Sequence, residues 1–221
     1  MVSGDIPSVN SPLFSSKYTL IPVIPSDNLT EDEKKTFFPP EKVDEHNEQA
    51  DLRPQNTWTT TIQEVNPVEM LEVQLVNSMI PSLLISQLTN LLQKAGNIAF
   101  QENGVGAFVI NVSSTEGQFA APKYGGHHPH TNMAKAALNM LTRTVAQSME
   151  VKGIYVNSVD TGWVTKMTPG GIQNEQTAVA PLSPADGAAR ILDPIYSSLN
   201  SSPDTKPCSG LLFKDFKEAP W

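Results

Sequence analysis

The sequence predicts an α/β fold in which crossover helices connect the strands of a parallel sheet. From residue 104 onward, three short runs of apolar and β-branched residues alternate with longer segments of helical periodicity. Strands buried on both faces have this near-continuous apolar composition, and a helix between two of them returns the chain to the same edge of the sheet. Residues 1–57 have a different composition, so we treat 58–221 as the folded α/β part.

The segment 1–57 is rich in proline and in acidic residues. Six of the 18 prolines fall within the first 50 residues, and the stretch from Asp27 to Asp51 is acidic and poor in apolar side chains. This composition predicts irregular, extended or loop-like chain. Tyr18–Ile24 has the composition of a strand, but Pro22 would restrict that strand to a sheet edge or to an isolated segment.

The first helix is predicted from Pro67 to Leu92. Asn66 is suited to the N-cap and Pro67 to the first helical position, and apolar residues then recur at helical spacing. Pro81 interrupts this pattern. We expect it to kink the helix, because proline has no N–H to donate and its ring clashes with the preceding turn.

The remaining elements follow in the order strand, helix, strand, helix, strand. Two buried strands are predicted over residues 104–112 and 153–159, with a strong helix over 131–150 between them. A further helix is expected over 184–200 and a short third strand over 209–213. Loops that contain glycine and proline, such as Pro169–Gly171, connect these elements.

Composition excludes several classes of protein. The 221 residues carry a formal net charge of −8, which argues against DNA, RNA or an anionic membrane as the main partner. The single cysteine, Cys208, leaves no internal disulfide and no cysteine-based zinc site. The first residues lack the basic and apolar regions of a secretory signal, and apolar runs such as Leu83–Ile85 are too short to span a bilayer. We therefore expect a soluble, cytoplasmic protein.

Polar residues follow the first two strands and lie on the helix between them. Ligands of open parallel sheets bind beyond the carboxyl ends of the strands, where Ser114 and the segment Asp160–Trp163 are expected. Thr131 and Lys135 are four residues apart on the helix, so both face the same side. Two hydroxyls and an ammonium in this arrangement could orient and polarise a bound carbonyl group.

Several stretches of residues 58–221 resemble the short-chain dehydrogenase/reductase family. They are Ile110–Ser114, the lysine within Met133–Leu138, and Gly153–Val164. Three more stretches resemble a divergent branch of that family: Glu116–Met140, Pro181–Arg190 and Leu212–Phe216. The resemblance implies a partial Rossmann-like, doubly wound sheet and an NAD(P)-dependent oxidoreductase that acts on a carbonyl or alcohol substrate. It also implies an oligomer built through the helices 67–92 and 131–150.

The resemblance implies a catalytic set that departs from the family pattern at one position. A helix Asn, a Ser after a strand and a Tyr-x-x-x-Lys pair form that set in the family. Asn77, Ser114 and Lys135 occupy three of these positions, and Thr131 occupies that of the tyrosine. A threonine hydroxyl is a far weaker acid than a phenol with a pKa of ~10. Tyr124, His128 or His130 could supply the proton from the preceding loop.

The implied cofactor is NAD or NADP, but half of its site has no counterpart. Lys135 would contact the nicotinamide ribose, and Gly162, Trp163 and Thr165 would line the cofactor site. The family holds the pyrophosphate at a glycine-rich turn between a strand and a helix. Gly104–Gly106 contains the one Gly-x-Gly of this sequence and precedes a strand instead. The dinucleotide-binding half and its first four strands are therefore expected to be absent.

Two functional readings follow from this departure. In the first, the chain is an oxidoreductase that needs a longer chain or another subunit to supply the dinucleotide half. In the second, it is a catalytically inactive, truncated protein, either a pseudoenzyme or a dimerisation partner of a full-length relative. The edge of the strand at 105–112 would then lack its usual neighbour, which is an aggregation liability unless it is covered.

Other residues keep simpler alternatives. Asn77 could hold a proton-relay water or bond backbone groups that the kink at Pro81 sets free. Trp163 could line a pocket or pack in the core. His127, His128 and His130 have no carboxylate or cysteine at a recognised ligand spacing, so we predict no metal site there.

Overall fold

The computed structural model describes residues 22, 24–43, 47, 49–123, 125–165, 167, 180–202 and 205–221. Four strands form one sheet in the order β1-β2-β3-β4: Ala107–Ser113, Ile154–Asp160, Leu212–Lys214 and Lys217–Ala219. The β1–β2 and β2–β3 pairs are parallel, and β4 pairs antiparallel with β3. The predicted α/β fold with a mostly parallel sheet is confirmed. Tyr124, Pro169–Gly171 and nearly all of Tyr18–Ile24 lie outside the described residues.

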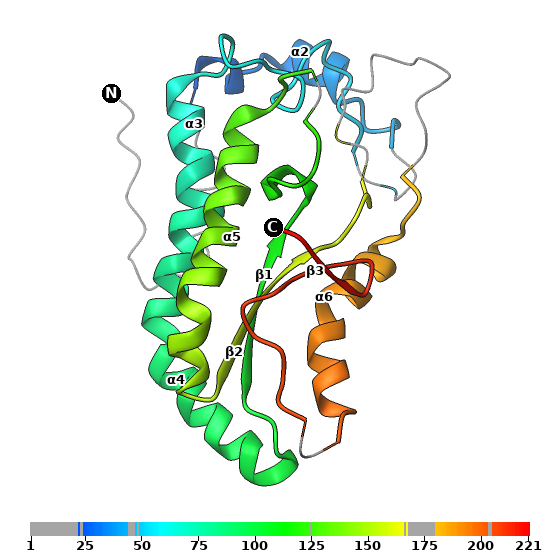
Figure 1. Cartoon of the computed structure of the whole chain (residues 1–221). Coiled ribbons are helices and arrows are strands. Elements are labelled where there is room, and N and C mark those ends of the chain that lie inside the picture. The colour runs from blue at the N-terminus through cyan, green and yellow to red at the C-terminus, as the bar shows by residue number, and fades with distance from the viewer. Residues whose placement is uncertain are drawn as a thin grey trace, which may run out of the picture.

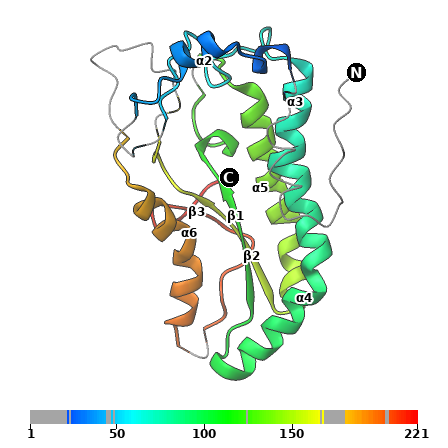
Figure 2. The same cartoon turned by 180° about the vertical axis from the view of Figure 1, so that it is seen from behind.

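Helices cover both faces of the sheet. The main ones are α3 (Pro67–Gln74), α4 (Ile80–Asn103), α5 (Pro129–Glu150) and α6 (Pro184–Leu199). Helices α3, α4 and α5 lie on one side of the sheet and α6 lies on the other (Figure 1, and from behind in Figure 2). The first helix continues to Asn103, beyond its predicted end at Leu92, and stops where Gly104 adopts a left-handed conformation with φ +76°. The first strand accordingly begins at Ala107 rather than at 104.

The irregularity expected at Pro81 occurs one turn earlier. Because Pro81 has no N–H, the carbonyl of Asn77 cannot receive the usual helical hydrogen bond. Residues Leu75–Met79 form a π-helical turn, η2, and the N–H of Ile80 donates to the carbonyl of Leu75, five residues back. Helices α3 and α4 therefore join through a widened turn, a feature found frequently at functional sites.

The core lies between β2 and helices α4 and α5. Every residue of β2 is buried, and Met149 of α5 and Ile85 of α4 pack against Ile154 and Val156. Three buried polar side chains, from β1, α5 and β2, are joined by hydrogen bonds across this layer. Asn111 Nδ2 donates to Thr142 Oγ1 at 2.8 Å, and Thr142 Oγ1 lies 2.8 Å from Ser158 Oγ. These bonds satisfy polar groups that burial would otherwise leave without partners.

Asn157 connects β2 to the segment that leads into β3. Its side chain is fully buried, Nδ2 donates to the carbonyl of Cys208 at 2.8 Å, and Oδ1 accepts from the N–H of Leu211 at 3.1 Å. We expect Asn157→Ala to lower the free energy of unfolding by about 3 kcal/mol, because two backbone groups lose their partners. Urea unfolding measures this loss. Asn90→Ala, at an exposed position of α4, is the control. Equal losses in the two variants would contradict the assigned role.

The acidic N-terminal segment contains a helix that composition did not predict. Helix α2 spans Glu31–Phe37 and begins with a capping box, in which Thr30 Oγ1 accepts from the N–H of Glu33 and Glu33 returns a bond to the N–H of Thr30. Acidic residues in its first turn and lysines in its last turn complement the helix dipole. These local signals stabilise a helix even though the segment offers few apolar side chains to bury.

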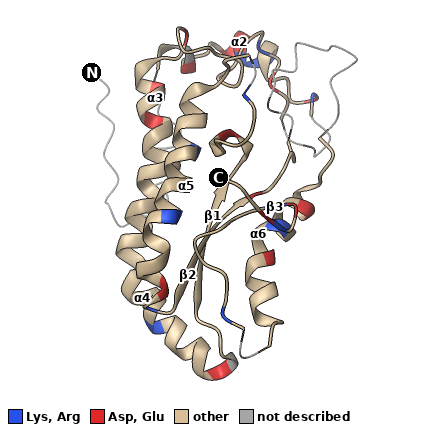
Figure 3. Ribbon diagram, in the orientation of Figure 1, with Lys and Arg blue, Asp and Glu red and all other residues tan. Residues whose placement is uncertain are grey.

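The joined helix Pro67–Glu102 is long and apolar enough, by length and composition alone, to cross a membrane. This corrects the expectation drawn from short uninterrupted runs such as Leu83–Ile85, because apolar residues spaced along a helix give the same average. No charged residue occurs between Glu72 and Lys94 (Figure 3). The inner face of the helix packs on β1 and α5. Of its most apolar 18-residue stretch, however, only 11% is buried. Its outer face is therefore an exposed apolar surface.

Candidate functional site

The loops that follow β1 and β2 meet at the carboxyl edge of the sheet. Ser113 and Asp160, the last residues of the two strands, are partners in the β1–β2 register. Ser114 continues in an extended conformation into a short 3₁₀ turn, η3 (Thr115–Gly117). The predicted position of the site, beyond the carboxyl ends of the strands, is thus formed by two adjacent loops and the first turns of α5.

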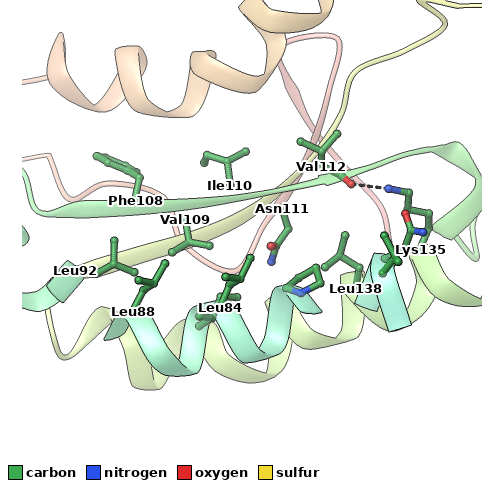
Figure 4. Close-up of a pocket in the computed structure, with 14 residues that line it drawn as sticks. Leu84, Leu88, Leu92, Phe108, Val109, Ile110, Asn111, Val112, Lys135 and Leu138 are labelled. Carbon is green, nitrogen blue, oxygen red and sulfur yellow. Dashed lines mark hydrogen bonds between the residues drawn. The ribbon is translucent and has the colours of Figure 1, made fainter. Parts of the chain in front are cut away.

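Lys135 reaches the end of β1 from α5. Its Nζ donates to the carbonyl of Val112 at 3.0 Å (Figure 4). Burial lowers the pKa of Lys135, and the carboxylate of Glu116 opposes this effect in part. An ammonium with a lowered pKa gives up its proton more readily than an exposed lysine does.

A groove of about 460 Å³ runs along β1 beneath α4. Apolar side chains from β1, α4 and the turn η2 form most of its lining: Val76, Leu84, Ile85, Leu88, Leu92, Phe108, Val109, Ile110 and Val112. Asn77 and Lys135 belong to the same lining and supply polar groups, and Lys135 lies at the Val112 end (Figure 4). The groove therefore combines a long apolar surface with an ammonium group near the end of β1.

The edge of β1 that faces this groove lies opposite the edge that pairs with β2. The N–H of Ala107 donates toward β2, to the carbonyl of Gly153, whereas the carbonyl of Val112 points the opposite way, to Lys135. Because backbone groups alternate in direction along a strand, Phe108 and Ile110 face the same edge as Val112. Among the described residues, no strand pairs with this edge.

The structure brings two of the four predicted catalytic residues into one groove. Asn77 and Lys135 share it, whereas Ser114 and Thr131 are not part of its lining. Thr131 lies in the first turn of α5, where its N–H donates to the carbonyl of His128. Within the described residues, no hydrogen bond joins Ser114, Thr131 and Lys135 to one another. Asn77 Nδ2 donates to the carbonyl of Val73 at 3.2 Å, so its side chain does bond backbone near the irregular turn.

The residues predicted to line the cofactor site form a compact loop after β2. The N–H of Gly162 donates to Asp160 Oδ1 at 2.9 Å, and Gly162 has a left-handed φ of +75°. Trp163 Nε1 donates to the carbonyl of Thr165 at 3.0 Å. The indole of Trp163 is 45% exposed, so its alternative role as a packed core residue is wrong.

The contacts that hold the Ser114 loop against α5 were not predicted from the sequence. Asn139 Nδ2 donates to the carbonyl of Gly117 at 3.1 Å. A Cβ atom on Gly117 would lie 2.6 Å from the carbonyl carbon of Lys135, so only glycine permits this approach. No spacing rule connects these positions. The one usable signal was the charged residue Asp160 directly after a run of buried β2 residues.

The three histidines have separate environments. His128 stacks on Trp58 with 4.0 Å between ring centroids, and its Nδ1 lies 3.0 Å from Asn132 Oδ1. His127 Nδ1 lies 2.9 Å from the carbonyl of Thr59. In the part of the chain that the structure describes, no three His, Cys, Asp or Glu side chains gather in a metal-binding arrangement. Thr115, His127, His128 and Asn132 instead line a second cavity, of about 250 Å³.

His130 is 1% exposed, and its Nε2 lies 3.8 Å from Glu69 Oε1, too far for a hydrogen bond. Burial lowers the pKa of His130, and the nearby His128 lowers it further. Burial also raises the pKa of Glu69, with contributions from Asp27 and Glu72. The interior between α3 and α5 thus disfavours both protonated His130 and ionised Glu69.

The lowered pKa of His130 predicts acid sensitivity. An unfolded histidine titrates near 6.5, so below that pH the unfolded state binds a proton that the folded state resists. We expect the free energy of unfolding to fall as the pH decreases from about 7 to about 5, and His130→Gln to flatten this decrease. The raised pKa of Glu69 makes the folded protein more stable as the pH decreases, which opposes the effect of His130. The difference between the pH slopes of His130→Gln and the unchanged protein therefore reports on His130. His127→Gln, at an exposed position, is the control. Identical slopes for His130→Gln and the unchanged protein would refute the prediction.

Comparison with known proteins supplies relatives for most of the chain. Residues 74–192 match the family model described as enoyl-(acyl carrier protein) reductase. Short-chain dehydrogenase srdF of Neurospora crassa is 30% identical over 172 residues, which cover 74% of this chain and 60% of that protein. An uncharacterised protein of Acanthamoeba polyphaga mimivirus is 30% identical over 181 residues, which cover 74% of this chain and 36% of that protein.

Solved structures share the fold. The NADPH-bound carbonyl reductase from chicken fatty liver superimposes with a TM-score of 0.55 at 24% identity, over 76% of this chain and 64% of that one. The carbonyl reductase Sniffer of Drosophila melanogaster gives a TM-score of 0.54 at 23% identity, over 73% of this chain and 60% of that one. The chain thus spans less than two thirds of the length of each of these relatives.

Proposed function

Because this chain belongs to the short-chain dehydrogenase/reductase family, we propose that it is the catalytic portion of an NAD(P)-dependent oxidoreductase that interconverts a carbonyl compound and an alcohol. The observation that carries the proposal is the position of Lys135. Its ammonium lies at the carboxyl end of β1, and it shares a groove with Asn77. An ammonium and an amide at this place suit the hydroxyl groups of a ribose.

The residues of the chain fit the nicotinamide half of the cofactor, which would supply the hydride when bound. Lys135 would hold the ribose hydroxyls, and the loop Gly162–Thr165 would cover the nicotinamide. Ser114 would donate a hydrogen bond to the substrate carbonyl. Thr131 would relay a proton from Lys135, whose pKa burial lowers, because a threonine hydroxyl is too weak an acid to be the proton source itself. The cavity next to Ser114, lined by Thr115 and His128, would receive the substrate.

The adenine and pyrophosphate half does not fit the residues of this chain. The one Gly-x-Gly of the sequence, Gly104–Gly106, precedes β1 and does not lead from a strand into a helix, where the pyrophosphate would be held. We propose that a further chain segment, from a longer protein or another subunit, supplies that half by pairing along the free edge of β1. The apolar groove beside this edge and the alternating backbone groups of Phe108 and Ile110 support such a docking mode.

We propose that the exposed face of the joined helix and α5 forms an oligomer interface. Large apolar side chains are exposed on both elements, among them Leu71, Met79, Leu83, Leu91, Met133 and Met140. Large exposed apolar patches mark interaction sites, and we assign this one to contact with a second copy or a relative of the chain. Sedimentation equilibrium gives the mass directly, and a monomer at micromolar concentration would contradict the proposal.

A turnover assay tests the proposed activity. The purified chain is incubated with NADPH or NADH and a panel of aldehydes and ketones, and the near-ultraviolet absorbance of the reduced nicotinamide is followed. Substrate-dependent loss of this absorbance would support the oxidoreductase. The cofactor is supplied at millimolar concentration, because the adenine half of its site is proposed to lie on another segment. A folded chain that turns over no substrate under these conditions would refute the proposed activity and would favour the catalytically inactive partner of a full-length relative.

A further inference from the structure

Asp160 is a buried carboxylate that the proposed reaction does not use. It ends β2, is 2% exposed and has a hydrogen-bond partner for each oxygen. Oδ1 accepts from the N–H of Gly162 at 2.9 Å. Oδ2 accepts from Thr115 Oγ1 at 2.8 Å, from Gln118 Nε2 at 2.9 Å and from Lys214 Nζ at 3.0 Å. A buried carboxylate persists only when it is paired and hydrogen-bonded in this way.

The partners of Asp160 come from three separate segments. Thr115 and Gln118 belong to the loop after β1, Gly162 to the loop after β2, and Lys214 to β3. Lys214 Nζ also donates to Thr115 Oγ1 at 2.6 Å, so carboxylate, ammonium and hydroxyl form a closed triangle. One carboxylate therefore determines the separation between the two loops that form the candidate site.

The same contacts connect Asp160 to Lys135. Gly117 lies between the two loop residues that Asp160 holds, and its Cα packs directly on the backbone of Lys135. Asn139, one turn further along α5, holds the carbonyl of Gly117. The position of Ser114 relative to Lys135 is thus fixed on one side by α5 and on the other by the Asp160 triangle.

We propose that Asp160, neutralised by Lys214, is the positioning residue that fixes the Ser114 loop and the Gly162–Thr165 loop relative to Lys135. The inference rests on the proposed function for its purpose, but its geometry stands independently of any turnover. It also gives the C-terminal strand pair β3–β4 a role, because this pair carries the lysine that neutralises the carboxylate.

Hydrogen exchange measured by mass spectrometry tests this role. Asp160→Asn keeps the shape of the side chain but replaces one acceptor oxygen by an NH2 group, within a site that presents four donors. We expect exchange to accelerate on the order of tenfold or more in residues 114–121 and 161–165, with the β1–β2–α5 core unchanged. Lys214→Met should accelerate the same two loops, and the double variant should fall short of the sum of the two effects.

The structural control is Asn157→Ala, which weakens the β2–β3 connection without touching either loop. If Asp160 were only a stabilising residue, Asp160→Asn would accelerate exchange throughout β2 and β3, as this control does. That outcome, or unchanged exchange in both loops, would overturn the proposal. Exchange needs no cofactor, so a failure of the oxidoreductase assignment would leave this result interpretable. Where turnover is present, Asp160→Asn should lower kcat more than it raises KM.

Discussion

Lys135→Met is expected to lower kcat/KM by about a thousandfold, equivalent to about 4 kcal/mol of transition-state stabilisation. The substitution keeps most of the aliphatic stem and removes the ammonium that bonds the carbonyl of Val112 and would hold the ribose. It also removes the group with a lowered pKa that would supply the relayed proton. The measurement is the initial rate of substrate-dependent NADPH oxidation.

The control for Lys135→Met is Lys94→Met, which removes an exposed lysine from α4. This variant should retain the activity of the unchanged chain. Because methionine keeps most of the aliphatic stem of Lys135, we expect the variant to remain folded, and circular dichroism checks that point. A Lys135→Met variant that is folded and as active as the control would remove the central residue of the proposed mechanism.

Gly117→Ala is expected to disrupt the site and the fold together. The added Cβ would lie 2.6 Å from the carbonyl carbon of Lys135 and 2.7 Å from its oxygen, so backbone rather than a flexible side chain must move. We expect a loss of about 2 kcal/mol in the free energy of unfolding from this overpacking. Turnover should fall about a hundredfold, because the Ser114 loop would move away from α5.

Gly187→Ala is the matched control for Gly117→Ala. It also adds a methyl group at a buried glycine, but the nearest atom is Val164 Cγ2 at 3.0 Å, a side-chain methyl that can rotate away. Gly187 lies in α6, where alanine favours the helix, so little loss is expected. Chemical denaturation is compared on both variants. Turnover is measured on Gly117→Ala alone, because Val164 belongs to the loop that is proposed to cover the nicotinamide. Equal effects would mean that the approach of Gly117 to Lys135 has no special importance.

The sequence predicts the fold well where periodicity is strong. The apolar runs of β1 and β2 and the helical spacing of α5 identified the parallel sheet and its crossover. Strand β4 was missed, because Lys217–Ala219 has no apolar alternation and pairs only through the turn at Asp215 and Phe216, both at positive φ. The extension of α4 from Leu92 to Asn103 was not predicted. Gly104 was assigned to the start of a strand, whereas in the structure it ends the helix.

The candidate site could be predicted only in part. Helical spacing and strand ends predicted Lys135 near the carboxyl end of β1, where the structure has it, whereas Asn77 was assigned through the family resemblance alone. The relation of Ser114 to Thr131 depends on how residues 114–118 pack on α5, and that packing rests on Gly117, Asn139 and Asp160. Such contacts join positions far apart in sequence, and no local pattern encodes them. An unpaired edge of β1 was predicted. The groove beside that edge, whose lining includes Lys135, was not.

The most direct test of the account is a parallel titration of the chain with NADPH and with reduced nicotinamide mononucleotide, followed by energy transfer from tryptophan. Only the nicotinamide half of the cofactor is proposed to bind this chain. Both ligands should therefore bind with similar dissociation constants, of about 1 mM, and Lys135→Met should abolish both signals. Micromolar NADPH binding without binding of the mononucleotide would contradict the account, because the adenine half would then have its own site. A folded chain that binds neither ligand would contradict the assignment of a nicotinamide site to Lys135.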